Sequence, residues 1–444
     1  MELAEFGATQ LVRMIENGEI SSLELGEACI GRIEDKEEDI GAWAHMDQNY
    51  AREQAEKCNL LHASGNPCGP LHGIPVGIKD IFDTEDFPTE YGSVIYAGHR
   101  PRVDCTAISL LKAAGAVIMG KTVTTEFAVY SPGKTRNPFD LNRTPGGSSS
   151  GSAAAVAAGM VPLAIGSQTN GSVIRPASFC GIVGFKPTHG AISRHGVLPQ
   201  SPLLDHVGVF ARSIEDLALI ADCLTSYDDR DMAMTAMTTR NFAAMATAEP
   251  PMPPKLAFVK SPFWDRADED TQEGFAELAE ALGEFCEEVD LPPHFDDGEE
   301  LHRTLLGADL AKNFAELYER AKDQLSDNLC AFIKKGQKVL AVDYNRAIDR
   351  REMLNDGLDD IFGEYDAILT PSTIGQAPPI ETTGDPIFCT LWTLCGTPAV
   401  TLPLLQGADG LPIGVQLVGQ RGDDARLLRT ANWLAGILAG DEPE

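Results

Sequence analysis

Several features that would direct a chain to a membrane or out of the cell are missing from this sequence of 444 residues. It has no run of about 18 uninterrupted apolar residues, so a membrane-spanning helix is not expected. Its first ten residues include Glu2 and Glu5 and lack the basic start and apolar stretch of a secretory signal. We therefore expect a cytoplasmic protein without a membrane partner.

Cationic residues are scarce relative to anionic ones. Lys and Arg number 35 against 66 Asp and Glu, which gives a formal net charge of −31. A surface of this sign repels phosphate backbones and anionic lipids, so nucleic acid is not expected as a partner. The simplest interpretation of the excess acid is a well-solvated surface.

The common metal-binding patterns are also missing. The ten cysteines include no C-x-x-C pair, and the nine histidines form no H-E-x-x-H motif. Single, scattered cysteines in a chain of this length are typical of reduced, mostly buried thiols. We expect no metal site and no cofactor, and we interpret each histidine as an ordinary surface or core residue.

What is present is an alternation of helix and strand signals in a chain that is 43% hydrophobic. The first sixty residues are predicted to be helical, with a capping box of the S-x-x-E form at Ser21 to Glu24. A short buried strand is expected at 74–78. A helix at 104–114, with Asp104 as its N-cap, precedes a strand at 116–119. This rhythm predicts an α/β enzyme.

The rest of the chain continues the pattern. Residues 131–152 are too rich in Pro, Gly, Ser and Asn for regular structure, and 226–254 reads as an exposed connector or a lid. The other expected helices lie at 153–158, 268–284, 299–324, 341–362 and about 423–439. The other expected strands lie at 162–165, 256–260, 367–369, 400–402 and 413–418. No internal repeat or domain boundary is evident, so one large sheet surrounded by helices is predicted.

The first of three chemically suggestive segments is G-I-P-V-G-I-K-D, residues 73–80. Lys79 ends an apolar strand, where a charged ammonium would be costly to bury. Its head could reach water or pair with Asp80. A desolvated lysine with a lowered pKa would instead be a good general base.

The second segment is T-P-G-G-S-S-S-G-S, residues 144–152. A flexible linker is one interpretation, although an alanine-rich helix follows at once. A phosphate-binding loop would need a different glycine pattern. Residues 147–151 match G-x-S-x-G, but the nucleophile elbow of that form requires a preceding strand, and here a loop is expected.

The third segment is G-S-Q-T-N-G-S-V-I-R-P-A, residues 166–177, directly after an expected strand. Ser172 follows Asn-Gly, a pair typical of tight turns, and it could be an ordinary turn serine. Alternatively, its hydroxyl is exposed for reaction and nearby backbone N–H groups converge on a developing oxyanion.

Taken together, the order and spacing of the three segments resemble the amidase signature family, and within it the bacterial malonamidase-like branch. The resemblance extends through F-C-G-I-V-G-F-K-P-T at 179–188 and weakens between about 226 and 365. It implies a single α/β amidase domain over 1–444. Its parts would be N-terminal helices at 1–60, the signature core at 61–225, a variable helical segment at 226–365, and C-terminal strands and a helix at 366–444.

The resemblance also implies roles for individual residues. Ser172 would be the nucleophile, Ser148 would bridge it to the base Lys79, and the 147–148 peptide would be cis. The oxyanion would be held by the amides of Thr169, Asn170, Gly171 and Ser172. Homodimers are common among the proteins that the chain resembles, so the resemblance also suggests a homodimer.

Three positions depart from the usual family form. Gln168 stands where most members have an acidic residue, and Asn170 stands in place of glycine. Arg175 lies one position later than usual; it could meet an acidic group of the substrate or bond loop carbonyls. Ser149 and Gln168 are further tentative substrate-binding residues.

The function expected from these features is hydrolysis of the C–N bond of small amides, carbamates (urethanes) or urea derivatives through an acyl-enzyme, with esterase side activity. One alternative is the glutaminase subunit of a tRNA-dependent amidotransferase. A non-catalytic α/β protein that binds a ligand through its serine-rich loop is a second alternative.

Overall fold

A computed structural model describes residues 2–236 and 241–440. The strands are β1 (Trp43–Met46), β2 (Pro75–Lys79), β3 (Val117–Thr122), β4 (Leu163–Gln168), β5 (Val183–Lys186), β6 (His206–Ala211), β7 (Leu256–Phe258), β8 (Cys286–Glu288), β9 (Ala367–Pro371), β10 (Ala399–Gln406) and β11 (Pro412–Val418). The α-helices are α1 (Ala8–Glu16), α2 (Ser22–Ile40), α3 (Gln48–Ala63), α4 (Thr106–Ala113), α5 (Ser150–Ala157), α6 (Ile174–Phe179), α7 (Ile214–Leu224), α8 (Phe242–Ala246), α9 (Glu269–Leu282), α10 (Gly298–Asn313), α11 (Ala315–Ala321), α12 (Asp327–Gly336), α13 (Ala341–Phe362), α14 (Ile387–Cys395) and α15 (Asp424–Ala439).

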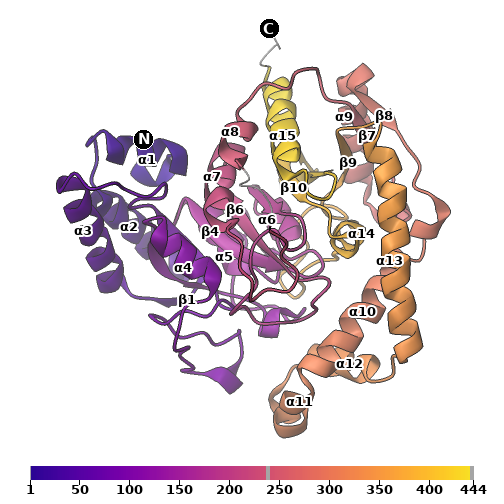
Figure 1. Ribbon diagram of the computed structural model, residues 1–444, viewed down its shortest axis with the longest axis horizontal. Coiled ribbons are helices and arrows are strands. Elements are labelled where there is room, and N and C mark those ends of the chain that lie inside the picture. The colour runs from indigo at the N-terminus through magenta and orange to yellow at the C-terminus, as the bar shows by residue number, and fades with distance from the viewer. Residues whose placement is uncertain (1, 237–240, 441–444) are drawn as a thin grey trace.

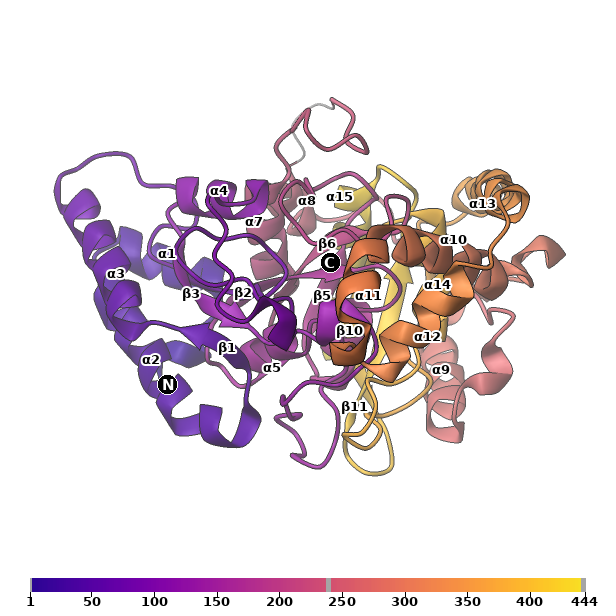
Figure 2. The same cartoon turned by 90° about the horizontal axis from the view of Figure 1, so that it is seen from below.

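All of these strands belong to one sheet of 11 strands, in the order β1-β3-β2-β4-β6-β5-β10-β11-β9-β7-β8. β2 runs parallel to both β3 and β4, whereas β6, β5, β10 and β11 pair in antiparallel fashion. Helices α1 to α3 lie at one end of the molecule and α9, α10, α12 and α13 toward the other, while α11 projects below the sheet in Figure 1 (Figures 1 and 2). The predicted α/β fold, a large mixed sheet surrounded by helices, is confirmed.

The parallel pairing of β2 and β4 places the candidate residues. Both strands are buried along their whole length, so side chains at their carboxyl ends enter a protein interior. Lys79 ends β2, and β4 leads directly into residues 169–172. Because parallel strands end at the same edge of a sheet, the first and third segments of the sequence meet there.

Local signals account for several element boundaries. The capping box at the start of α2 is present: Ser21 accepts a bond from Glu24 N (3.1 Å), and Glu24 accepts one from Ser21 N (2.7 Å). The same helix ends at Gly41, whose φ of 65° is the left-handed conformation that glycine adopts without strain.

Other predictions were wrong at particular residues. The first sixty residues include a strand, β1, which pairs with β3. Helix α4 has Cys105 as its N-cap, because the Asp104 carboxylate instead bonds Lys112 Nζ (2.6 Å) and Glu85 N (2.9 Å). The helix expected at 153–158 starts at Ser150, within the stretch that was expected to be irregular.

The second half of the chain also departs from expectation. The helix expected at 299–324 is divided into α10 and α11 at Phe314, and α12 was not foreseen. The connector at 226–254 is not simply exposed, since Asp231, Phe242 and Ala246 are buried; its residues 237–240 lie outside the described ranges. Within the described residues, no helix has the length and apolar character needed to cross a membrane.

Candidate active site

Lys79 is completely buried and has only hydroxyl partners. Its Nζ lies 2.7 Å from Ser148 Oγ and 2.8 Å from Ser167 Oγ. Burial lowers the pKa of Lys79 well below the usual lysine value, and the charge of Asp205 only partly opposes this effect. A lysine in this setting loses its proton more readily than an exposed lysine and can then act as a base.

Two other strand lysines are equally buried but differently bonded. Lys121 Nζ pairs with Asp80 Oδ1 at 3.0 Å, so Asp80 is not the partner of Lys79 that the sequence allowed. Lys186 Nζ donates to the carbonyl oxygen of Thr397, and burial lowers its pKa to about 7. Lys121 also bonds the hydroxyl of Thr89 (2.7 Å), but it has a carboxylate partner, whereas Lys79 bonds only hydroxyls, one of which belongs to Ser148 in the cavity of Ser172.

Ser148 stands in a loop that other hydroxyls anchor. The Gly147–Ser148 peptide is cis, as the resemblance implied. Ser150 Oγ bonds Val123 O (3.3 Å), just after β3, and Ser152 Oγ bonds Ile165 O (2.9 Å), in the middle of β4. These bonds tie the start of α5 to both strands. The residues before Ser148 form a loop rather than a strand, so the nucleophile-elbow interpretation is excluded.

Ser172 is half-buried and lines the same narrow cavity as Ser148. In the described part of the chain, the backbone N–H groups of residues 169–172 have no hydrogen-bond acceptor. The next two N–H groups, of Val173 and Ile174, both donate to Gln168 Oε1 (2.8 and 3.0 Å). Four consecutive free amides beside a serine hydroxyl form an arrangement suited to holding an oxyanion.

The three side chains predicted to bind substrate all have partners within the protein, and Arg175 also lines the cavity of Ser172. Gln168 is fully buried and caps the turn after Ser172, and its Nε2 donates to Thr393 Oγ1 (2.9 Å). Ser149 Oγ bonds the backbone of Ser167. Arg175 Nη1 donates to Gly384 O (2.9 Å) and Nη2 to Gly147 O (2.6 Å). All three side chains thus hold the loops around Ser148 and Ser172.

The cavity in front of Ser172 is mainly apolar. It has room for about 20 Å³, roughly one water molecule, so a substrate can enter only if lining side chains move. Asn170 faces it with its amide fixed by Tyr130 OH (3.1 Å) and Thr390 Oγ1 (2.8 Å). The remaining lining residues are Ala128, Val129, Thr169, Gln200, Leu306, Leu310 and Thr383.

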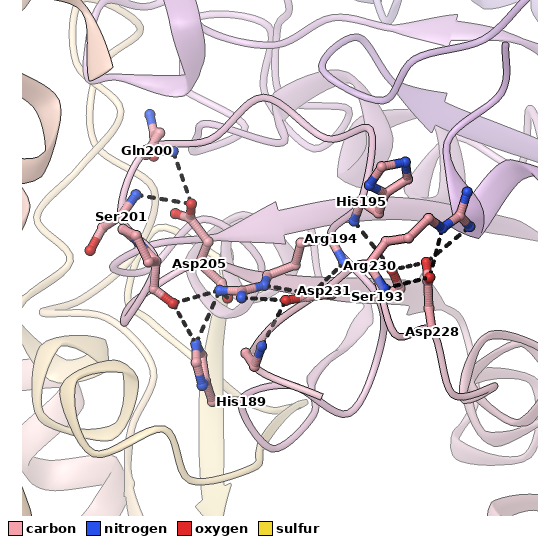
Figure 3. A network of polar contacts seen from close by, with 12 residues as sticks. His189, Ser193, Arg194, His195, Gln200, Ser201, Asp205, Asp228, Arg230 and Asp231 are labelled. Atoms are coloured by element: carbon pink, nitrogen blue, oxygen red, sulfur yellow. Dashed lines mark hydrogen bonds and ion pairs between the residues drawn. The ribbon is translucent and has the colours of Figure 1, made fainter. Parts of the chain in front are cut away.

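A second, larger cavity of about 300 Å³ adjoins Ser167 and Thr169. Asp205 lies in its wall and accepts bonds from Thr169 Oγ1 (2.7 Å), Gln200 N (2.9 Å) and Ser201 N (2.9 Å). Figure 3 shows Asp205 among the polar residues of this loop, beside the ion pair of Arg194 with Asp231. Burial raises the pKa of Asp205 to about 6. The Asp205 carboxylate thus connects the loop at Gln200 and Ser201 to Thr169, the first of the four residues with free amides.

Some residues of this site were not identified from the sequence. Ser167 lies in the third segment, and the alternation of strand residues could have placed it on one face with Thr169. Nothing in the sequence near Tyr130 or Asp205 indicated a role, because folding brings them to Asn170 and Thr169 from other parts of the chain.

Comparisons with known proteins agree with this geometry. The family model described as Amidase matches residues 24–428. A glutamyl-tRNA(Gln) amidotransferase subunit of Chloroflexus aggregans is 34% identical over 455 residues, covering 94% of this chain and 93% of the relative. The corresponding subunit of Carboxydothermus hydrogenoformans is 33% identical, covering 97% of each.

Solved structures show the same fold. One, from a complex described as vestigial and as revealing the origins of an s-triazine catabolic enzyme, has a TM-score of 0.92 at 28% identity, covering 97% of this chain and 98% of that one. The peptide amidase of Stenotrophomonas maltophilia has a TM-score of 0.87 at 28% identity, with coverages of 99% and 98%. The chain belongs to the amidase signature family. It is a hydrolase of C–N bonds.

Proposed function

We propose that this protein hydrolyses small neutral amides through an acyl-enzyme on Ser172. The observation that carries the proposal is the buried Lys79 amine, which bonds only hydroxyls. One of these belongs to Ser148, which lines the same cavity as Ser172, and the free amides of residues 169–172 adjoin that serine. A serine hydroxyl needs a base to become a nucleophile, and the site offers a lysine in place of a histidine.

In this mechanism Ser148 relays the proton. The neutral Lys79 amine takes a proton from Ser148 Oγ while Ser148 takes one from Ser172 Oγ, and Ser172 Oγ attacks the carbonyl carbon. The amides of residues 169–172 hold the resulting oxyanion. Collapse of the intermediate breaks the C–N bond, and the proton returns through Ser148 to the leaving nitrogen. Water then attacks the acyl-enzyme, releases the acid and restores Ser172.

The lining of the cavity supports a neutral substrate. Among the described residues that line it, Arg175 is the only charged side chain, and carbonyl oxygens already occupy two of its nitrogens. These two bonds hold the guanidinium against the loops, although its Nε has no hydrogen-bond partner among the described residues. Neutral aliphatic or aryl amides, carbamates and esters place the same carbonyl before Ser172 without a charge to bury.

A second candidate is the glutaminase subunit of a tRNA-dependent amidotransferase. Similarity over the whole chain supports it, because the two curated relatives named above are such subunits and match 94% and 97% of this chain. The cavity supports it less well. Free glutamine carries an α-ammonium and an α-carboxylate, and the lining offers no carboxylate for the ammonium.

Product release from a small panel separates the two candidates. The panel would contain neutral amides, half-amides of dicarboxylic acids, aryl carbamates and glutamine, with Ser172→Ala as the blank. Turnover of neutral amides or carbamates by the isolated chain is the expected result. If the chain hydrolysed only glutamine, and only when a second subunit was present, the proposed amide hydrolysis would be rejected in favour of the amidotransferase function.

Replacing Arg175 tests whether the guanidinium positions the loop or binds substrate. Arg175→Met leaves the carbonyls of Gly147 and Gly384 without donors, so we expect unfolding to become easier by about 3 kcal/mol. The specificity constants for neutral amides and half-amides should fall by the same factor. A rise in KM confined to the half-amides would place Arg175 on the substrate instead.

Replacing Asp205 tests its electrostatic effect on Lys79. The carboxylate stabilises the protonated lysine, and therefore raises the pKa of Lys79 against the larger effect of burial. Asp205→Asn should lower that pKa further, so the acidic limb of the activity profile should move to lower pH. We also expect kcat to decrease, since Thr169 loses a charged partner. An acidic limb that moves to higher pH would contradict this prediction.

A further inference from the structure

The end of α3 and the segment before β2 bring together three side chains that are common metal ligands. His62 lies in the last turn of α3, Cys68 in the following loop, and His72 just before β2. One ligand atom from each lies within 4.8 Å of the other two. Their spacing matches no common zinc motif, so the sequence alone predicts ordinary surface or core residues at these positions.

The separation of these atoms is close to that required by a bound metal ion. Zinc binds imidazole nitrogen at about 2.0–2.1 Å and thiolate sulfur at about 2.3 Å, so tetrahedral ligands lie roughly 3.3–3.8 Å apart. An approach of about 1–1.5 Å would complete the geometry. Cys68 stands in a loop and His62 is an exposed side chain at a helix end, so both can make that movement.

The surroundings of His72 are those of a metal-bound histidine. Its ring is 2% exposed, and Nε2 lies 3.0 Å from the carbonyl oxygen of Cys58. Its Nδ1 is buried and has no hydrogen-bond partner within the described residues. Metal-bound histidines commonly donate their other ring N–H to a backbone carbonyl, which orients the ring and sets its tautomer.

A second cluster of acidic side chains provides a contrast. Glu85, Asp86 and Asp104 also lie close together, but Lys112 Nζ sits among them, 2.5 Å from Asp86 and 2.6 Å from Asp104. The ammonium group of Lys112 therefore already neutralises part of the charge of that cluster. No lysine or arginine pairs with His62, Cys68 or His72 in the described part of the chain.

We propose that His62, Cys68 and His72 bind one zinc ion, with water in the fourth position. Two imidazoles and one thiolate form a donor set that prefers zinc to magnesium or calcium. The ion would join the end of α3 to the segment leading into β2, the strand that ends at Lys79. Its role would be structural, since this cluster shares no residue with the cavity before Ser172.

Cobalt titration of the full-length chain, freed of any affinity tag and stripped with a chelator, tests the proposal. We expect one Co²⁺ per chain, a thiolate-to-cobalt charge-transfer band, visible bands of a tetrahedral site, and displacement by one equivalent of Zn²⁺. Zn²⁺ should also raise the melting temperature by a few degrees. Absence of the charge-transfer band at stoichiometric Co²⁺ would overturn the proposal.

Matched variants assign the ligands. Cys68→Ser should lose the charge-transfer band, and His62→Gln should weaken cobalt affinity about tenfold or more. Cys330→Ser and His99→Gln, which change a thiol and an exposed imidazole elsewhere, should bind as the unmodified chain does. Persistence of the band in Cys68→Ser, or its equal loss in Cys330→Ser, would refute the site. Amide hydrolysis reports that each variant is folded.

Discussion

Replacing Ser172 with alanine is expected to lower kcat for amide hydrolysis by a factor of about 10⁴ or more. The change removes the attacking oxygen and leaves the free amides of residues 169–172 in place, so substrate binding should be affected little. The half-buried hydroxyl makes no hydrogen bond to described residues, and its loss should not destabilise the fold. Initial rates of product release measure the effect.

A serine-directed phosphonate provides an independent measurement. It should attach to the unmodified chain at one residue and fail to attach to Ser172→Ala. Ser109→Ala is a matched control, because Ser109 is an exposed serine on α4 outside both cavities. Labelling that survives in Ser172→Ala, or hydrolysis at the unmodified rate, would show that another residue is the nucleophile.

The second large effect is expected from Lys79→Met, which should reduce kcat by about 10³ or more. Methionine has a similar shape and no charge, so the buried strand should tolerate it. In the unmodified protein, activity should rise with pH as Lys79 loses its proton, at a pH well below the usual lysine range. The residual activity of Lys79→Met should lack that rise. Measurement of kcat against pH distinguishes the two profiles.

Lys186→Met is the matched control for this experiment. Lys186 is another fully buried strand lysine, and burial lowers its pKa to about 7, yet its partners are backbone carbonyls outside the site. We expect Lys186→Met to lower stability and to retain the acidic limb of the profile. If Lys186→Met lost the acidic limb and Lys79→Met kept it, the base would be Lys186 and not Lys79.

The class of fold and the three central residues were predictable because their signals are local. The strand ending in Lys79, the serine-rich loop at Ser148 and the turn at Ser172 are each contained in about ten consecutive residues. The capping box at Ser21 is another local pattern, and it appears in the structure as predicted. Predicted helix boundaries were wrong where a side chain had another partner. At Asp104 the carboxylate pairs with Lys112 and does not cap α4.

Residue type and short spacing are enough to indicate the family and the order of the three segments, and they predict Ser172, Ser148 and Lys79 as the residues that react. Only the tertiary structure distinguished Lys79 from two other buried lysines, directed Arg175 to Gly384 and Gly147, and placed Asp205 against Thr169. Burial and hydrogen bonding join residues far apart in the chain, and these contacts set a side chain's pKa and its availability to a substrate. His62, Cys68 and His72 lie within eleven consecutive residues, but only the turn from α3 into β2 shows that their ligand atoms come together.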